Sequence, residues 1–418
     1  MKHSLSVLQN YFSFILLVLI SFTSVNLFSQ TWFEQSSGTL QTLYSVQFLN
    51  TNTGFMVGGA GTILKTTNGG TNWLGLISGT TNDLKSVYFT DMNTGTCVGD
   101  NSTVKRTTNG GTTWVTQTTI GSQLNSTYFV NANTGFIVYS NGGIFATTDG
   151  GNTWVNHFIN GKAFFNDAYF FDASSGLITG SSQGISRTTD GGSSWTSLLI
   201  PSALNGISFV NIFSNTGWAV GNGGSIFKST NKGLNWNNQT ISLANTLYEV
   251  SAIDSSNAYI VGQAGIILRT NNGGNNWITQ SNPTTNTLRS VSFANGNTGW
   301  ACGTFGTILK TTNGGLTFIS EPGNNLPEHF QLYQNYPNPF NPTTKIKFDI
   351  PKSGKVRLSV YNIQGKETSE LMNEELEPGK YSINLDAENL PAGVYFYKLR
   401  ITNSSGEVQQ IKKMILIK

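Results

Sequence analysis

Two carboxylates, Asp167 and Glu249, are the side chains of this sequence best placed for acid–base chemistry. Asp167 follows Phe165-Asn166 and Glu249 follows Leu247-Tyr248, so each is the third residue of a similar short segment. Glycoside hydrolysis uses two carboxyl groups that face each other within about 10 Å. A carbohydrate-active hydrolase is therefore one interpretation of the pair, and it requires a fold that brings the two side chains together.

The residue before each carboxylate belongs to a set that recurs along the chain. It is the second residue of a segment that is rich in strand-forming side chains and begins with Leu or Phe. If these segments are the inner strands of a ring, their polar and aromatic side chains line one mouth of a central channel, where ligands commonly bind. With Asp167 and Glu249 they form the candidate ligand site, and a merely solvated rim is the alternative. The set is Tyr44, Lys85, Asn125, Asn166, Asn205, Tyr248 and Arg289.

Other chemistry is poorly supported by the sequence. Gly180-Ser181-Ser182-Gln183-Gly184 has the spacing of a hydrolase nucleophile, but that chemistry needs a strand-to-helix turn and a histidine partner. His157 is the one histidine of the central region, and Cys97 and Cys302 lie far apart, so we interpret both cysteines as buried thiols. We assign no catalytic residue, no metal site and no cofactor.

The residue immediately before the turn motif of each repeat forms a second recurring set. It is basic in six repeats and is an alanine, Ala146, in the seventh. We interpret the long aliphatic stems as covers for neighbouring tryptophans. A rim that binds anions is the alternative. The basic residues are Lys65, Arg106, Arg187, Lys228, Arg269 and Lys310.

These candidates are positioned by a repeat. The stretch Thr66-Thr67-Asn68-Gly69-Gly70-Thr71-Asn72-Trp73 recurs along the chain at intervals of 40 or 41 residues. A period of this length with four short strands per repeat is typical of a β-propeller blade. The closing aromatic residues of the motif are Trp73, Trp114, Trp154, Trp195, Trp236, Trp277 and Phe318.

The repeat count predicts how the ring closes. Seven segments begin inner strands, but eight segments begin outer strands, because Trp32 opens one more. We expect Trp32–Gly38 to supply the outer strand of the last blade, beside Gly306–Thr312, which leaves no open sheet edge. The segment at Phe318 is then not needed as an outer strand.

Residues 147–154 and 188–195 carry a resemblance. With Asp149 and Asp190 in the turn, and Trp154 and Trp195 after it, they are similar to the Asp-box of bacterial neuraminidase (BNR) repeats. The whole region resembles the BNR-type propeller of the photosystem II stability and assembly factor family. The resemblance implies that the Asp, or the Asn that replaces it elsewhere, holds the turn and that the Trp packs between outer strands. Because Asp-box propellers include sialidases, it also keeps the hydrolase interpretation open.

The last part of the chain differs in composition. Strand-like runs at 344–350, 355–361, 379–385, 394–402 and 409–417 are separated by turn signals and predict a small Ig-like β-sandwich. Tyr336-Pro337-Asn338-Pro339-Phe340 and the basic, apolar ending resemble the type A C-terminal sorting domain of type IX secretion substrates. This resemblance implies a partnership with the type IX secretion machinery and passage across the outer membrane.

The N-terminus has the order of a secretory signal, with Lys2 and His3 before an apolar run. We therefore expect an all-β chain: a signal peptide at 1–29, a seven-bladed β-propeller at 30–318, a linker at 319–327 and a sorting domain at 328–418. The net charge of +3 over 418 residues is too small to indicate a nucleic-acid partner. The expected function is non-catalytic binding of a protein or glycan, either secreted or at the cell surface, without a transmembrane span in the mature form.

Overall fold

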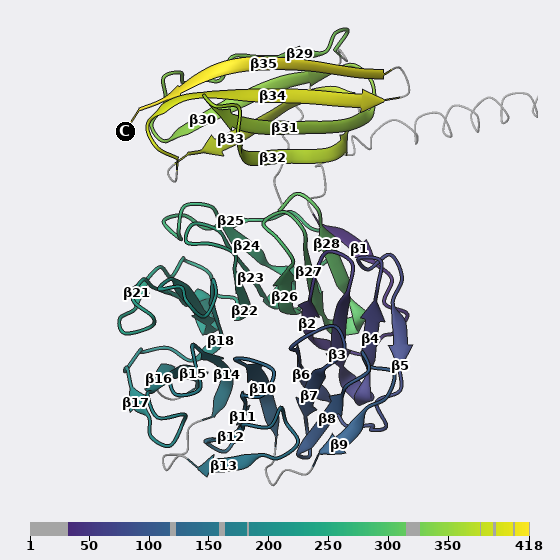
Figure 1. The fold of residues 1–418 in the computed structure, drawn as a ribbon, viewed down its shortest axis with the longest axis vertical. Helices are drawn as coiled ribbons and strands as arrows, with labels where there is room; N and C mark the ends of the chain where they lie inside the picture. The colour runs from purple at the N-terminus through teal and green to yellow at the C-terminus, as the bar shows by residue number, and fades with distance from the viewer. Residues whose placement is uncertain are drawn as a thin grey trace, which may run out of the picture.

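The structure is a computed structural model that describes residues 32–117, 123–158, 164–181, 184–314, 327–376, 378–387, 390–403 and 406–417. Seven four-stranded antiparallel sheets surround a common centre, and the C-terminal residues form two further sheets (Figure 1). The expected seven-bladed propeller and C-terminal β-domain are confirmed. The predicted signal peptide, Phe318 and all but the last residue of the predicted linker lie outside the described residues.

Each blade begins with an inner strand and a second strand that follows a tight turn. The first strands are β2 (Leu43–Phe48), β6 (Leu84–Phe89), β10 (Leu124–Phe129), β14 (Phe165–Phe170), β18 (Leu204–Phe209), β22 (Leu247–Ala252) and β26 (Leu288–Phe293). The second strands are β3 (Gly54–Gly58), β7 (Gly95–Gly99), β11 (Gly135–Tyr139), β15 (Gly176–Gly180), β19 (Gly217–Gly221), β23 (Ala258–Gly262) and β27 (Gly299–Gly303).

The third and outer strands complete each blade. The third strands are β4 (Ile63–Thr66), β8 (Thr103–Thr107), β12 (Gly143–Thr147), β16 (Gly184–Thr188), β20 (Ile226–Ser229), β24 (Ile267–Thr270) and β28 (Ile308–Thr311). The outer strands are β5 (Leu74–Leu76), β9 (Val115–Gln117), β13 (Val155–Phe158), β17 (Thr196–Ser197), β21 (Asn237–Asn238), β25 (Ile278–Thr279) and β1 (Phe33–Gln35).

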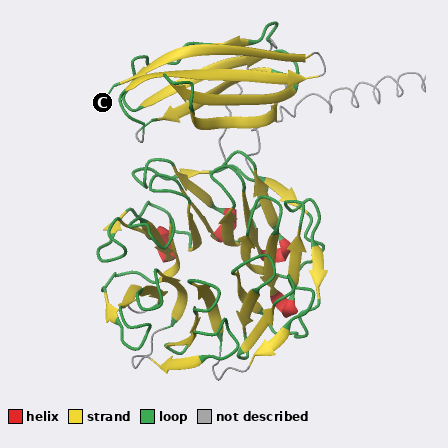
Figure 2. Cartoon of the chain, in the orientation of Figure 1, coloured by secondary structure: helices red, strands yellow, loops and turns green. Residues whose placement is uncertain are grey.

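Short 3₁₀ turns link some second and third strands and are the helical segments drawn in Figure 2. They are η1 (Gly59–Gly61), η2 (Asn222–Gly224), η3 (Gln263–Gly265) and η4 (Thr304–Gly306). Gly180 ends β15 and Gly184 begins β16, so the segment with nucleophile-like spacing connects two antiparallel strands, as expected from its place in the repeat.

The ring closes through the N-terminal outer strand. β1 pairs antiparallel with β28, with Phe33 opposite Lys310 and Gln35 opposite Ile308. Trp32 is fully buried and packs edge-on against Phe293, with 5.8 Å between ring centres. The closure predicted from the count of outer strands is therefore confirmed, and the last blade joins residues from both ends of the propeller.

The propeller core lies between blades rather than at one centre. Second strands are buried throughout, whereas outer strands are mostly exposed. A second-strand aromatic ring of one blade stacks on the first-strand Phe of the next, as Trp300 does on Phe48 at 3.4 Å. Trp73 then packs edge-on against the same Phe48 at 5.8 Å. These contacts link neighbouring blades, whose described strands form separate sheets.

The other tryptophans of the repeat follow the same rule. Trp114, Trp154, Trp195 and Trp236 each pack edge-on against the first-strand Phe of their own blade. Trp277 differs because β22 ends in Ala252, and it packs against a hydrophobic cluster that includes Trp218. Apart from Trp277, these tryptophans thus contact the inner strand of their own blade, and the expected packing between outer strands stays a prediction.

The polar part of the repeat holds its turn, as expected. Asp149 accepts hydrogen bonds from the Thr153 hydroxyl at 2.6 Å, the Thr153 backbone N–H at 2.9 Å and the Thr147 hydroxyl at 2.8 Å. Asp190 is bonded in the same way, and these bonds, the Thr153 or Ser194 hydroxyl first, lower the pKa of both carboxyls to about 2. In repeats with Asn, such as Asn68, the side-chain oxygen accepts the equivalent bonds.

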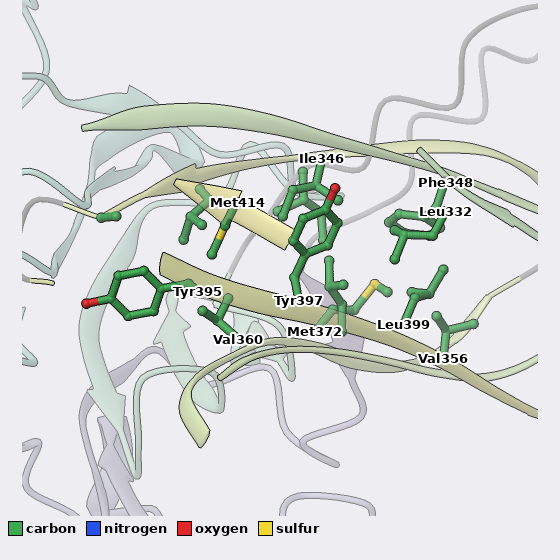
Figure 3. Packing of buried hydrophobic residues seen from close by; sticks show 14 of the residues in the cluster. Leu332, Ile346, Phe348, Val356, Val360, Met372, Tyr395, Tyr397, Leu399 and Met414 are labelled. Atoms are coloured by element: carbon green, nitrogen blue, oxygen red, sulfur yellow. The ribbon is translucent and has the colours of Figure 1, made fainter. Parts of the chain in front are cut away.

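The C-terminal domain is a sandwich of a three-stranded and a four-stranded sheet. The strands are β29 (Gln331–Leu332), β30 (Thr343–Ile350), β31 (Gly354–Asn362), β32 (Glu367–Leu376), β33 (Gly379–Asp386), β34 (Gly393–Asn403) and β35 (Gly406–Leu416). Their orders are β29-β30-β33 and β32-β31-β34-β35. Buried side chains from both sheets, including Phe348, Tyr397 and Met414, fill the space between them (Figure 3).

Neither β32 nor the short β29 is among the strands expected from the sequence. The β32 sequence holds several charged residues and few strand formers, which hides it from pattern analysis. It lies at the edge of its sheet, where charged side chains are tolerated because one side of the strand faces solvent.

Candidate functional site

All nine side chains of the predicted site lie around one cavity. It has a volume of about 380 Å³ and opens at the end of the ring where the first strands begin, which we call the first-strand face. The sequence analysis did not include four further lining residues. The predicted lining residues are Tyr44, Lys85, Asn125, Asn166, Asp167, Asn205, Tyr248, Glu249 and Arg289, and the additional ones are Ser45, Ser86, Gln123 and Ser126.

A β-bulge places each second residue at the cavity. In every blade the pairing of the first and second strands shifts between the first and third residues of the first strand. The second residue is left unpaired, and a bulge of this kind redirects a side chain. Seven bulges, one per blade, therefore explain why the seven side chains gather at one mouth.

Three asparagines form one side of the mouth and connect adjacent blades. The side-chain N–H of Asn125 donates to Phe165 O at 2.5 Å, that of Asn166 to Leu204 O at 2.8 Å, and that of Asn205 to Leu247 O at 2.8 Å. Each amide therefore holds the start of the next first strand. We call these residues of blades 3 to 5 the amide arc.

Two cation–tyrosine pairs form the other side. The Lys85 Nζ lies 3.8 Å from the centre of the Tyr44 ring, and the Arg289 guanidinium lies 4.2 Å from that of Tyr248. Such contacts attract a cation to the negative face of the ring. Around the channel the order is Tyr248, Arg289, Tyr44 and Lys85, in blades 6, 7, 1 and 2, and we call these residues the cation–tyrosine arc.

Asp83 organises one pair of this arc, although the sequence analysis did not single it out. It accepts hydrogen bonds from Tyr44 Oη, Lys85 Nζ and Ala60 N, each at 3.0 Å. Burial alone would raise the pKa of Asp83, but these bonds outweigh it and hold the pKa below its usual value. Lys85 also lies 3.5 Å from Asp100, so its charge is compensated within the protein.

Asp167 joins three blades. Its Oδ1 accepts bonds from Ser126 Oγ at 2.6 Å and Ala168 N at 2.8 Å, and its Oδ2 accepts from Ile207 N at 3.0 Å. In other blades a serine occupies this place, as Ser45 does when it accepts from Val87 N at 3.3 Å. Burial raises the pKa of Asp167 despite these bonds. Both oxygens are already used to hold the blades together.

Glu249 lies against Gly206, the equivalent residue of the preceding blade. A Cβ at Gly206 would come within 2.7 Å of Tyr248 O and 3.2 Å of Glu249 Oε1, so glycine makes room for this carboxyl. Glu249 Oε1 accepts from its own neighbour Val250 N at 3.1 Å. Burial, and then the like charge of Asp167, raises the pKa of Glu249 well above its usual value.

The third-strand cations contact second-strand aromatic rings. Lys65, Lys228, Arg269 and Lys310 lie over rings of their own blades, 5.0–5.7 Å from the ring centres. The expected covering of the outer-strand tryptophans by their stems stays a prediction. Four third-strand cations also donate hydrogen bonds to the repeat turn of the next blade. Lys65 donates to Gly110 O at 2.8 Å, Arg106 to Gly150 O at 2.7 Å, Arg187 to Lys232 O at 3.1 Å and Lys228 to Gly273 O at 2.8 Å.

Apolar side chains are also exposed on the first-strand face. Leu40 and Ile77 lie in loops from an outer strand to the next first strand and are 83% and 88% exposed. Phe305 is exposed at the tip of η4 with a positive φ of 57°, which is unusual for a bulky residue. Phe305 and Leu40 line a shallow second cavity of about 400 Å³ at the closure of the ring.

Comparison with known proteins places the propeller in a family. Residues 117–240, 158–284 and 235–328 match the family described as photosynthesis system II assembly factor YCF48, and together these segments span half of the chain. The chain belongs to this family. Within this YCF48-family propeller, the matched residues cover most of blades 3 to 7. They hold seven of the nine predicted site residues: Asn125, Asn166, Asp167, Asn205, Tyr248, Glu249 and Arg289.

Solved structures have the same fold as this YCF48-family propeller. A structure titled "YCF48 bound to D1 peptide" has a TM-score of 0.58 at 20% identity and covers 68% of this chain and 97% of its own. YCF48 from Cyanidioschyzon merolae has a TM-score of 0.56 at 18% identity and covers 67% and 98%. The WD40 propeller of Doa1 has a TM-score of 0.55 at 14% identity and covers 66% and 96%. No curated protein matches the chain.

The C-terminal domain matches a second family. Residues 334–418 match the secretion system C-terminal sorting domain, so the YCF48-family propeller is joined to a type IX sorting domain. This domain supports export to the cell surface or the medium. Among the described residues, none of the helical segments has the length and apolar character needed to cross a membrane, and no group of three or more His, Cys, Asp or Glu side chains could hold a metal ion. Cys97 and Cys302 are free, buried thiols, as expected.

Proposed function

We propose that this chain is an exported, non-catalytic binding protein whose propeller holds a segment of another protein at the first-strand face. The observation that carries the proposal is the convergence of side chains from all seven blades on one cavity, each placed there by a bulge. Cavities of about 300 Å³ or more with a few convergent polar groups are the usual form of a ligand site.

The surroundings of the cavity favour a protein over a glycan. Leu40, Ile77 and Phe305 expose apolar side chains on the same face as the polar mouth, and exposed apolar surface near polar groups is typical of protein-binding surfaces. A solved relative of this fold is described as bound to a peptide, which is consistent with such a ligand.

The carboxyl groups support a binding role rather than hydrolysis. A catalytic nucleophile or base needs a free oxygen directed at the substrate. Both oxygens of Asp167 accept hydrogen bonds from three blades, so this residue acts as a connector. Glu249 with its raised pKa could still act as a general acid, which keeps a glycoside hydrolase as the second candidate.

An array of synthetic peptides, incubated with the full chain, tests the proposed function. We expect a defined subset of peptides to bind, and Tyr248→Ala to weaken that binding more than Phe213→Ser, which changes an exposed residue in a loop at the opposite end of blade 5. Binding that is absent, or unaffected by Tyr248→Ala, would contradict the proposal. Hydrolysis of fluorogenic glycosides that is lost in Glu249→Gln would support the hydrolase instead.

A further inference from the structure

Arg289 is the cation of the cavity whose charge is not compensated within the described protein. Its Nε is buried and has no hydrogen-bond partner among the described residues. A guanidinium has five N–H donors in a planar fork, and leaving a buried donor without a partner is costly. The face of the Tyr248 ring, over which the guanidinium lies, offers it no hydrogen-bond acceptor of the carboxylate kind. Because Arg289 lines the cavity, a bound ligand can supply an acceptor to its guanidinium.

Lys85 provides a contrast within the same arc. It forms ion pairs with Asp83 at 3.0 Å and Asp100 at 3.5 Å, and it lies over Tyr44 much as Arg289 lies over Tyr248. The two cation–tyrosine pairs therefore differ in one respect: Lys85 has carboxylate partners within the protein, Asp83 and Asp100, whereas Arg289 has none among the described residues.

The two carboxyl groups of the cavity, Asp167 and Glu249, do not act as the anionic partner of Arg289. The acceptors of Asp167 are occupied by Ser126, Ala168 and Ile207. Glu249 bonds Val250 N, and within the described residues neither carboxyl forms an ion pair with Arg289. Burial, and then the charge of Asp167, raises the pKa of Glu249.

We propose that Arg289 binds a carboxylate of the protein ligand, held beside Tyr248 and Tyr44. This inference rests on the proposed function and names the group that enters the cavity. A guanidinium and a carboxylate can form two parallel hydrogen bonds, which fix orientation as well as adding affinity. The carboxylate belongs either to the C-terminus of the ligand or to an Asp or Glu side chain, because the chemistry of recognition is the same.

A calorimetric titration of the full chain with blocked amino acids distinguishes the two sources of the carboxylate. N-acetylalanine carries a terminal carboxylate, N-acetylglutamate α-amide carries a side-chain carboxylate, and N-acetylglutamine α-amide carries neither. We expect one or both carboxylates to bind, with the tighter one identifying the source, and the neutral probe to bind at least tenfold more weakly. Sodium sulfate serves as a plain anion and should bind no better than the neutral probe.

Variants of Arg289 complete the test. Arg289→Gln should weaken carboxylate binding at least tenfold, and Arg289→Lys, which keeps the charge but loses the fork, should weaken it less. Lys398→Gln removes a cation over Tyr361 in the sorting domain and should leave binding unchanged. Equal binding by the wild type and Arg289→Gln, equal binding of the neutral probe, or no binding of any probe overturns the inference. Peptides that bind on the array without a carboxylate would overturn it while leaving the proposed function in place.

Discussion

Asp167 accepts a hydrogen bond at Oδ2 from the backbone N–H of Ile207, 3.0 Å away in the next blade. The same residue accepts from Ser126 of the preceding blade. A residue that first drew attention as an acid–base candidate thus connects three consecutive blades. Serines make the equivalent bond elsewhere, such as that from Val46 N to Ser290 Oγ at 3.2 Å across the closure of the ring.

This relationship predicts different effects for two substitutions. Asp167→Ala removes the acceptor for Ile207 N and should leave the protein less stable than Asp167→Ser, which restores the serine found in other blades. An unsatisfied buried donor costs about 1–3 kcal/mol. Thermal unfolding of both variants at one pH measures the difference. Equal melting temperatures would show that the bond to Ile207 contributes nothing.

Glu249 should make stability depend on pH. Because its pKa is raised in the folded chain, the stability it contributes is fully present below the unfolded pKa of about 4.3 and is lost as pH rises through the folded pKa. The glutamine of Glu249→Gln cannot ionise, so at pH 8 this variant should have a higher melting temperature than the wild type. The difference in melting temperature should close toward pH 4. Glu34→Gln, at an exposed carboxylate, is the control. A gap that is constant with pH contradicts the burial of the Glu249 charge.

Closure of the ring should depend on Trp32 more than on an equivalent tryptophan. Trp32 is fully buried against Phe293 in the blade that joins both ends of the propeller, whereas Trp277 lacks a Phe partner. Replacing a buried Trp by Ala costs about 3–5 kcal/mol. Trp32→Ala should therefore lower the melting temperature more than Trp277→Ala. The reverse order would contradict the role of β1 as the closing strand.

A gain of stability is expected at Ala146. The cation at this position in neighbouring blades donates to the repeat turn of the next blade, as Arg106 does to Gly150 O. Blade 3 has alanine there and no donor to offer Gly191 O. Ala146→Lys should supply the bond and add about 0.5–1.5 kcal/mol, or a rise of about 2 °C or more in melting temperature. Ala146→Met provides the stem without the donor, and an equal gain with Met would assign the effect to packing alone.

Much of this architecture is readable from periodicity. The spacing of the tryptophans predicts the blades, and the surplus outer strand at Trp32 predicts the closure, because both follow from counting. The second residue of each first strand is likewise predictable as a channel position. These features are local or repetitive, so a single sequence is enough to reveal them.

What the sequence hides depends on contacts between blades. The bulges that redirect the channel residues depend on backbone geometry. The space that Gly206 leaves for Glu249, and the hydrogen bond from Lys65 to Gly110 O, join residues about 40 or more positions apart. β32 is hard to predict for another reason: its charged residues are tolerated in an edge strand but have low β-strand propensity.

The most direct test of the account asks which face of the propeller meets the ligand. A photo-crosslinking amino acid is placed at Ile77 on the first-strand face or at Phe213 in the loop between β18 and β19 at the opposite end, positions that are 88% and 82% exposed. The measurement is the yield of covalent adduct with a peptide selected on the array. The account predicts an adduct at position 77 that Arg289→Gln reduces, and little adduct at position 213. Adduct formation at position 213 but not at position 77 would contradict it.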